Sequence, residues 1–398
     1  MLQALGVLAF VVALLTSVMI HEFGHFFFAK RFGMKVTEFF LGFGYKIWSY
    51  RKGETEFGIK AIPAGGYCRI VGMSIHEELS EEDAPRAFVR STTLRRLIVL
   101  GAGSVSHFII GFLLIFAIFF GIGTSTPLPI ISQVLPCITT STVTNACTKG
   151  ATPSPAFTAG LKTGDEIIAV NGKKVSNWSQ DVLVIRNSAG KPLTLEINRA
   201  GQSLTIMVVP AKVMINGKEY GKLGILSKIG LQRESVGTSL HDTWFLGSNF
   251  FTTSIKSLIT LPSKVPALFR QSFLGAKRDA SGLVGVVGVA QATAATASNH
   301  TLTFGDKLET FLLIIASLNI FVGIFNLLPL LPLDGGHMAV AVVDGFRRVR
   351  ARRAGLPEPN PIDLEKLMPI TAVVFIFLVA LSLMLLAADI FNPVHFNL

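Results

Sequence analysis

Four long apolar segments dominate the pattern of hydrophobic and polar positions along this chain of 398 residues. They cover about 2–28, 97–122, 311–333 and 367–390. Each is long enough to cross the roughly 30 Å of hydrocarbon in a bilayer as one helix. Four crossings bring both chain ends to the same side, so the pattern predicts a multi-pass α-helical membrane protein with four transmembrane helices.

Shorter patterns fill the segments between these helices. Residues 35–96 alternate apolar and polar positions with glycine-containing turns between them, which predicts strands and a β-hairpin. The longest polar stretch begins with a compact domain predicted over 127–235. A linker follows over 236–310, and its residues 244–262 place apolar positions at helical spacing, interrupted by Lys256. We expect an amphipathic helix lying at the membrane interface there, not a fifth crossing.

The membrane domain is therefore predicted in two parts, 1–126 and 311–398, with the polar domain and its linker inserted between them. Basic side chains accumulate at the cytoplasmic ends of transmembrane helices. The loop 337–366 is strongly basic, whereas neither Lys nor Arg precedes the first apolar segment or follows residue 390. The arginines in question are Arg347, Arg348, Arg350, Arg352 and Arg353. These flanks predict a protein of the cell membrane with both termini and the inserted domain outside the cytoplasm.

The composition supports a membrane protein and argues against a nucleic-acid partner. Apolar residues make up 50% of the chain and charged residues 15%, against a charged fraction of about 25% in soluble domains. The 36 basic and 25 acidic residues give a net charge of +11, but the basic residues are spread over loops. We interpret them as topology determinants and as contacts to anionic lipid headgroups of the bilayer.

Three cysteines are present, and their spacing does not match a zinc ribbon. Cys137 and Cys147 lie in a stretch that the topology places outside the cytoplasm, where a disulfide persists. The spacing leaves both a bridge and two free thiols open, because a disulfide also requires close Cα atoms.

The end of the first apolar segment carries the pattern His21-Glu22-Phe23-Gly24-His25, or HExxH. Residues i and i+4 share one face of a helix, so the two imidazoles can hold one Zn2+ ion while Glu22 reaches a water molecule. Zinc lowers the pKa of that water to about 7, and the glutamate takes its proton. Such residues are costly at membrane depth and are functional there by default. The pattern predicts His21 and His25 as metal ligands and Glu22 as the catalytic base.

A catalytic zinc site usually has three protein ligands and one open position, so a third ligand is expected elsewhere. The third apolar segment ends in a run from Asn326 through Pro329 and Pro332 to Asp334. Prolines free backbone carbonyls, which a membrane tolerates only where the chain faces protein or a water-filled site. Asp334 is therefore the candidate for the third ligand.

HExxH in a first span together with N-x-x-P and L-D-G-G in a later span resembles the site-2 protease family of intramembrane zinc metalloproteases, peptidase family M50. The details are similar to its actinobacterial branch. The resemblance implies a metalloendopeptidase that hydrolyses peptide bonds within the transmembrane segments of single-span substrates. It also implies that Asp334 is the third Zn2+ ligand and that Asn326 contacts the substrate backbone.

The resemblance extends to two further regions. The stretch Ala61 to Tyr67 is similar to the family's membrane-re-entrant β-hairpin, which implies that Gly65, Gly66 and Tyr67 contact an extended substrate. A transmembrane helix must unwind before its amides can react, and an edge strand can hold the unwound segment. The run 159–172 resembles the PDZ domains of bacterial proteases, with a short helix, a strand and an Asn-Gly turn. It implies an extracytoplasmic PDZ-like α+β domain that gates the site.

The partners follow from the same resemblance. It implies substrates that are anti-sigma factors already trimmed by an upstream site-1 protease. His107 stands in the second span where many family members have asparagine, and we interpret it as hydrogen-bonded between helices in preference to a metal or substrate contact. His337 is either a group that supports the metal ligands or a solvent contact.

Two other classes of protein share some of these features. A non-catalytic, zinc-containing membrane scaffold with a peptide-binding PDZ domain would want four protein ligands for a closed metal site, and only three can be named. A metal-ion transporter would need acidic or histidine residues in several spans, and the last span offers Asp389 only at its end.

Overall fold

The computed structural model describes residues 1–73, 77, 79–138, 147, 151–176, 178–215, 217–278 and 282–394. The chain divides into two compact units. The first combines Met1–Gly121 with Glu234–Leu398, and the second is Ile122–Arg233. Each unit has its own hydrophobic core.

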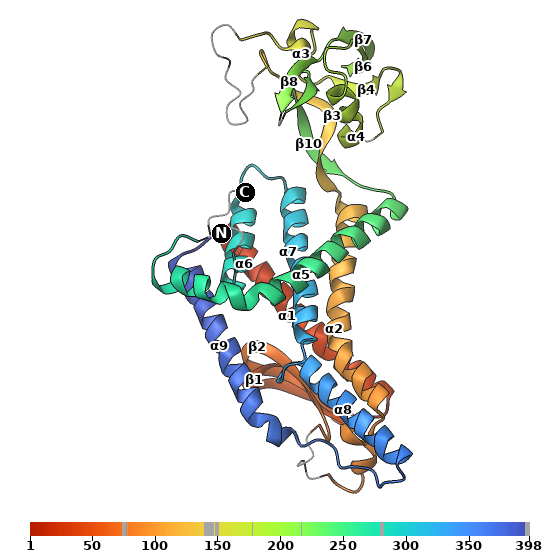
Figure 1. The fold of residues 1–398 in the computed structure, drawn as a ribbon, viewed down its shortest axis with the longest axis vertical. Helices are drawn as coiled ribbons and strands as arrows, with labels where there is room; N and C mark the ends of the chain where they lie inside the picture. Colours follow the sequence, from red (N-terminus) through yellow and green to blue (C-terminus); the bar gives the residue numbers. More distant parts are fainter. Residues whose placement is uncertain are drawn as a thin grey trace. The chain divides into compact units, whose positions relative to one another are not determined.

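Long apolar helices build the first unit (Figure 1). They are α1 (Leu2–Arg31), α2 (Thr93–Phe116), α7 (Phe304–Asn326) and α9 (Met368–Phe391). A π-helical segment, η3 (Ala117–Ile122), continues α2, and a 3-10 turn, η4 (Leu364–Leu367), precedes α9. Among the described residues these are the four helices long and apolar enough to cross a membrane. The prediction of four such helices is confirmed.

Helix α7 differs from the predicted segment 311–333 at both ends. It starts earlier because Thr303 and Asp306 form a capping box that satisfies its first amides. It stops at Asn326 because Pro329 and Pro332 in the following loop cannot continue a helix. The chain then enters α8 (Asp334–Arg353), so much of the predicted basic loop 337–366 is helical.

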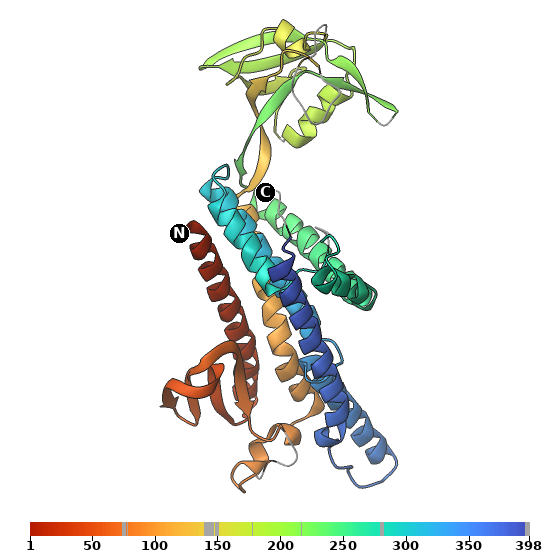
Figure 2. The ribbon, with the colours of Figure 1, turned by 90° about the vertical axis from the view of Figure 1, so that its left-hand side faces the viewer.

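The predicted hairpin is present as β1 (Val36–Lys52) and β2 (Thr55–Ile70), followed by the 3-10 turns η1 (Ala84–Arg86) and η2 (Phe88–Arg90). Figure 2 shows it beside the C-terminal half of α1, against which β2 packs. Glu38 to Leu41 pair both with 56–59 and with 66–69. Residues 66–69 therefore lie along an outer edge of this small sheet.

Two further helices complete the first unit, α5 (Val236–Phe273) and α6 (Val286–Ser298). Helix α5 extends beyond the predicted 244–262 and contains two prolines, Pro262 and Pro266. It packs against α2, α7 and α9, and α6 packs against α1. Within this unit the start of α1 and the end of α9 lie at the same end of the helices, and α8 lies toward the other end (Figure 1). An even number of crossings gives that arrangement.

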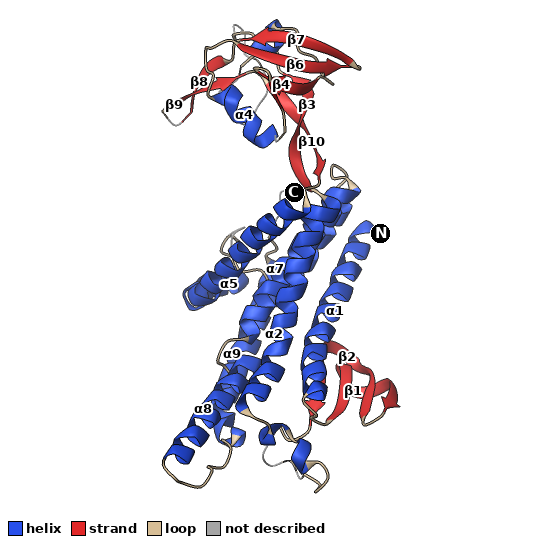
Figure 3. Ribbon diagram, turned by 90° about the vertical axis from the view of Figure 1, so that its right-hand side faces the viewer, coloured by secondary structure: helices blue, strands red, loops and turns tan. Residues whose placement is uncertain are grey.

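Strands dominate the second unit (Figure 3). Its sheet has the order β10-β3-β4-β6-β7, with β5 paired to β4, and a separate ribbon joins β8 to β9. The strands are β3 (Thr124–Val134), β4 (Glu166–Val170), β5 (Lys173–Lys174), β6 (Leu193–Arg199), β7 (Gln202–Val208), β8 (Ala211–Ile215), β9 (Lys218–Lys222) and β10 (Ile225–Gln232). The helices are α3 (Pro155–Thr158) and α4 (Trp178–Arg186).

The local pattern predicted for 159–172 is present. Gly160 follows α3 with φ of 74°, and Asn171 and Gly172 form the turn between β4 and β5. Trp178 and Ile185 of α4 are buried in the sheet's core. Cys137 and Cys147 form a disulfide with Cα atoms 5.9 Å apart, which decides between the two alternatives that the spacing left open.

Candidate metal centre

One face of α1 is buried along its whole length. Its buried residues recur at intervals of four or seven positions, at Gly6, Phe10, Ser17, His21, His25 and Ala29. The two histidines of the HExxH pattern therefore lie one turn apart on the packed face. Their Nε2 atoms are 3.1 Å apart.

Asp334 reaches the same point from the other part of the sequence. It is the first residue of α8, and the loop before it folds tightly over the first turn of that helix. A Cβ added at Gly335 would lie 2.3 Å from the carbonyl oxygens of Leu327 and Leu328. Glycine is therefore required after the aspartate, which explains the L-D-G-G sequence in physical terms.

The three side chains have the geometry of a metal site. Asp334 Oδ2 lies 3.2 Å from His21 Nε2 and 3.4 Å from His25 Nε2. Ligand atoms about 2.0–2.1 Å from a tetrahedral zinc ion stand roughly 3.3 Å apart, so these separations fit. His21, His25 and Asp334 form the group with metal-ligand spacing found among the described residues.

Unsatisfied polar atoms support the same conclusion. Asp334 Oδ2 is buried and accepts no hydrogen bond from the described residues. A buried carboxylate oxygen without a donor costs free energy unless a cation neutralises it. The donor set of two imidazoles and one carboxylate is that of catalytic zinc sites, so the residues present fit a zinc ion.

Helix α2 supports the histidines from the side. His25 Nδ1 lies 2.7 Å from the carbonyl oxygen of Val99 and donates a hydrogen bond to it, which leaves Nε2 for a metal. One turn further, a Cβ added at Gly103 would lie 2.5 Å from Cε1 of His21 and 2.6 Å from Nε2 of His25. Only glycine lets α2 approach the two histidines so closely.

Glu22 lies between the histidines and the edge of the hairpin. A Cβ added at Gly66 would stand 3.1 Å from Cγ of Glu22, and the backbone of Cys68 also faces this carboxylate. The predicted catalytic glutamate and one predicted substrate-binding residue, Gly66, are therefore in contact.

The other predicted residues are placed less directly. Gly65 neighbours Gly66 in β2, and the hydroxyl of Tyr67 donates a hydrogen bond to Glu38 while its ring stacks on Phe40. Asn326 is the last residue of α7, and the loop from it leads to Asp334.

The structure also shows the surroundings of His107 and His337. His107 Nδ1 bonds Asn319 Oδ1 at 2.8 Å, as the interpretation of a helix-to-helix hydrogen bond requires. His337 lines a small cavity with Arg96 and Asp344, between α2 and α8.

Sequence reasoning missed the contributions of α2. Val99 acts through its backbone carbonyl, and Gly103 acts by the absence of a side chain, so neither residue type signals a role. The available signal was the spacing of four between Val99, Gly103 and His107, which places them on one helix face.

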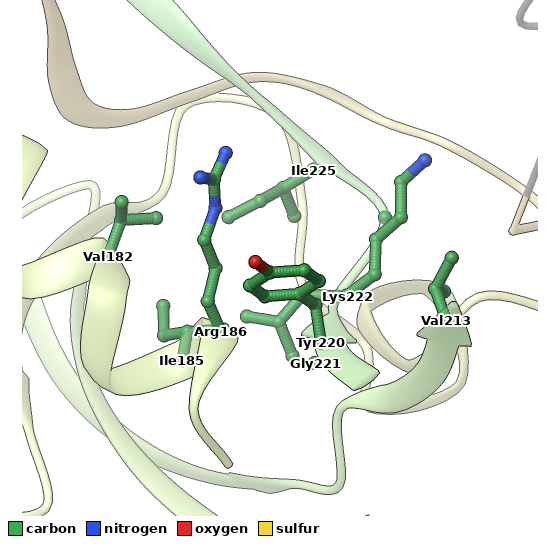
Figure 4. Close-up of a pocket in the computed structure, with 10 residues that line it drawn as sticks. Val182, Ile185, Arg186, Val213, Tyr220, Gly221, Lys222 and Ile225 are labelled. Atoms are coloured by element: carbon green, nitrogen blue, oxygen red, sulfur yellow. The ribbon is translucent and has the colours of Figure 1, made fainter. Parts of the chain in front are cut away.

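The second unit contains a separate groove of 530 Å3 between α4 and the strands β8 to β10. Val182 and Ile185 line it from α4, and Ile225 lines it from β10 (Figure 4). The ring of Tyr220 lies within it, with Arg186 and Lys222 on either side in this view. The groove combines apolar walls with two basic side chains at its margin.

A HExxH helix completed by an aspartate from a second, apolar part of the chain defines a membrane zinc metalloprotease. The model of peptidase family M50 matches residues 9–355. The chain is 33% identical to the zinc metalloprotease Rip1 of Mycobacterium tuberculosis (strain H37Rv), over 99% of both chains. It is 32% identical to Rip1 of Mycolicibacterium smegmatis, again over 99% of both. The chain therefore belongs to peptidase family M50, the site-2 proteases, and is a zinc-dependent metalloendopeptidase. The scaffold and transporter alternatives are set aside.

Proposed function

We propose that this protein cuts the transmembrane segments of single-span membrane proteins inside the bilayer, with His21, His25 and Asp334 as zinc ligands and Glu22 as general base. One observation carries the proposal. The described structure brings the ligand atoms of α1 and α8 within 3.4 Å of one another, with Glu22 and the hairpin edge beside them.

The chemistry is that of amide hydrolysis. When bound, zinc supplies a Lewis acid that lowers the pKa of a water molecule to about 7. The Glu22 carboxylate accepts the proton of the attacking water and delivers it to the leaving amide nitrogen. The backbone of Cys68 faces the Glu22 carboxylate and favours the orientation in which it can do so.

In this proposal the hairpin and α7 position the substrate. Residues 66–69 of β2 pair with β1 on one side, which leaves their other edge for an extended peptide. Gly66 lies at this edge against Glu22, so a strand added there would pass the catalytic carboxylate. In this proposal Gly65 and Tyr67 contribute to the same edge, and Asn326 holds the substrate backbone near the metal.

We further propose that the substrates are anti-sigma factors already trimmed by a site-1 protease. The support is the family resemblance of the motifs and the topology read from the flanks of the spans. In this proposal the basic side chains of α8 lie on the cytoplasmic side, and both termini and the second unit lie outside the cytoplasm. A substrate that has lost its outer domain would then reach the site without obstruction.

The second unit is proposed to be a PDZ-like domain whose groove binds an apolar peptide ending in a carboxylate. Val182 and Ile185 supply apolar contacts, and Arg186 and Lys222 supply positive charge at the margin. A trimmed substrate has such a new C-terminus. Binding there would bring the substrate to the protease.

The groove is tested by peptide binding to the full chain in detergent. Arg186→Glu should weaken binding of an apolar peptide with a free carboxylate about tenfold or more, because a charged hydrogen bond is worth about 1.5–3 kcal/mol. Lys191→Glu changes the same charge at an exposed position outside the groove and should have no effect. Equal binding of the amidated peptide would refute carboxylate recognition and leave a steric filter.

The catalytic assignment is tested by zinc content together with cleavage of a single-span anti-sigma factor. Glu22→Gln should keep its zinc and lose cleavage by roughly a hundred- to ten-thousandfold, because proton transfer is removed while the ligands remain. His21→Ala and Asp334→Ala should lose both zinc and cleavage, and Asn326→Ala should keep zinc and lose turnover. Full zinc in Asp334→Ala, or cleavage by Glu22→Gln, would overturn the assignment.

A further inference from the structure

One stripe of α2 faces the metal centre at every fourth residue. Val99 accepts the hydrogen bond of His25, Gly103 contacts both histidine rings, and His107 follows one turn later. His107 is 3% exposed, and its ring centroid lies 5.0 Å from that of His21. The proposed zinc chemistry gives this buried histidine no role.

The chemistry of Asn319 fixes the proton on His107. Asn319 Nδ2 lies 2.8 Å from the carbonyl oxygen of Ile315, which can only accept, so the amide nitrogen must point there. The same nitrogen donates to Ser17 Oγ at 3.1 Å. The amide oxygen therefore faces His107 Nδ1 at 2.8 Å, and Nδ1 must carry the hydrogen. The Nε2 atom of His107 then bears a lone pair and acts as an acceptor.

Within the described part of the chain, His21 lacks an acceptor for the hydrogen on its Nδ1 atom. A histidine that binds metal through Nε2 carries its hydrogen on Nδ1, and a protein group normally accepts that hydrogen. His25 meets this requirement through Val99, but His21 Nδ1 is buried with no hydrogen-bond partner among the described residues. A Cβ added at Gly103 would lie 2.7 Å from His21 Nδ1, so this edge of the ring faces α2 just one turn before His107.

We propose that His107 is a positioning residue for His21. In the zinc-bound protein its Nε2 atom accepts the hydrogen of His21 Nδ1, a hydrogen bond that is absent among the described residues of this structure, and this bond holds the Nε2 atom of His21 toward the metal. Asn319 and Ser17 complete the chain, so residues of α1, α2 and α7 together orient one ligand. The inference rests on the zinc ligands proposed above and adds the group that sets the tautomer of the first of them.

The test compares zinc release to a chelator, and the visible spectrum after cobalt substitution, in detergent-purified full-length variants. His107→Phe removes the acceptor and should release zinc roughly ten- to a hundredfold faster, with an altered cobalt spectrum. His107→Gln keeps an acceptor and should stay close to wild type. Ile109→Phe adds similar bulk on the exposed face of α2 and serves as the control.

Each outcome bears on the proposal. Rescue by glutamine supports it, whereas unchanged zinc release in His107→Phe, or equal losses in both His107 variants, overturns it. If His107→Phe does not fold, Asn319→Leu, which frees the tautomer of His107, must accelerate release relative to His107→Gln. A cobalt spectrum of lower coordination number in His107→Gln would make His107 a ligand and refute the positioning role. Full zinc in His21→Ala would instead refute the ligand assignment itself.

Discussion

At residue scale, the close approach of α2 to the proposed metal ligands depends on a missing methyl group. Gly103 faces His21 and His25, and the space that an alanine Cβ needs is already occupied by both imidazole rings. On the same helix Gly101 has Met338 Cε as its near neighbour, 3.7 Å from an added Cβ, which is ordinary van der Waals contact. There is therefore space for an alanine at position 101 of this helix but not at position 103.

Gly103→Ala should lower zinc occupancy and cleavage together, because the added methyl group displaces the ligand rings. Alanine favours a helix over glycine by about 1 kcal/mol, so the loss cannot come from weaker helix formation. Gly101→Ala is the matched control and should keep both zinc and activity. Elemental analysis beside the cleavage assay measures the effect, and a fully loaded Gly103→Ala protein would contradict it.

The residues predicted from the sequence and those missed differ in how their roles arise. HExxH and the aspartate of L-D-G-G could be predicted because their side-chain chemistry and spacing within one segment are visible in the sequence. Val99, Gly103 and the Asn319–His107 pair depend on which helices pack together. No local sequence pattern encodes that packing. Every residue has a backbone carbonyl and every glycine lacks a Cβ, so neither feature marks a functional position in the sequence.

At the scale of elements, hydropathy located the membrane helices but not the end of α7. An apolar run such as 327–333 looks like the continuation of a span, yet its prolines force a loop that carries the chain to α8. The arginines of α8 make this segment polar, so hydropathy alone predicts a loop there. Its helical form places Asp334 at a helix N-terminus, where a carboxylate is stabilised.

The turn of the hairpin is held to its surroundings by Glu54. Arg86 donates two hydrogen bonds to this carboxylate, at 2.6 and 2.7 Å, and Lys30 at the end of α1 also pairs with it. The Arg86 guanidinium, reinforced by Lys30, lowers the pKa of Glu54 from 4.5 to about 2. A depressed pKa means that the ionised form stabilises the fold, so the contribution is complete above about pH 4.5 and disappears as the pH falls toward 2.

Glu54→Gln should therefore lower the unfolding temperature at pH 7, and the difference from wild type should shrink between about pH 4.5 and 2. Thermal unfolding in detergent across this range measures the difference. Glu81→Gln removes the same charge from an exposed side chain and should have little effect. A difference that stays constant with pH would show that Glu54 acts through packing and not through its charge.

At the scale of the whole molecule, the first unit assembles its proposed metal centre from segments that lie far apart in sequence. Helix α2 packs against α1, α7 and α8, which carry or precede the proposed ligands. The second unit forms its own sheet and core from the residues inserted between α2 and α5. The insertion separates the two sequence motifs, and His21, His25 and Asp334 all belong to the first unit.

One buried ion pair joins the two halves of this membrane unit. Arg96 of α2 and Asp344 of α8 are 4% and 2% exposed, and they meet at 3.3 Å. Asp344→Asn leaves Arg96 buried and unpaired, so it should destabilise the fold by about 3 kcal/mol or more. The same change should speed zinc release, because Asp334 is the first residue of α8. Arg347→Gln removes an exposed partner of the same carboxylate and should cost at most about 1 kcal/mol. Thermal unfolding and the rate of zinc release to a chelator measure both effects. Equal behaviour of Asp344→Asn and Arg347→Gln would refute the role of the Arg96–Asp344 pair, whereas recovered stability in the double variant Arg96→Met/Asp344→Leu would support it.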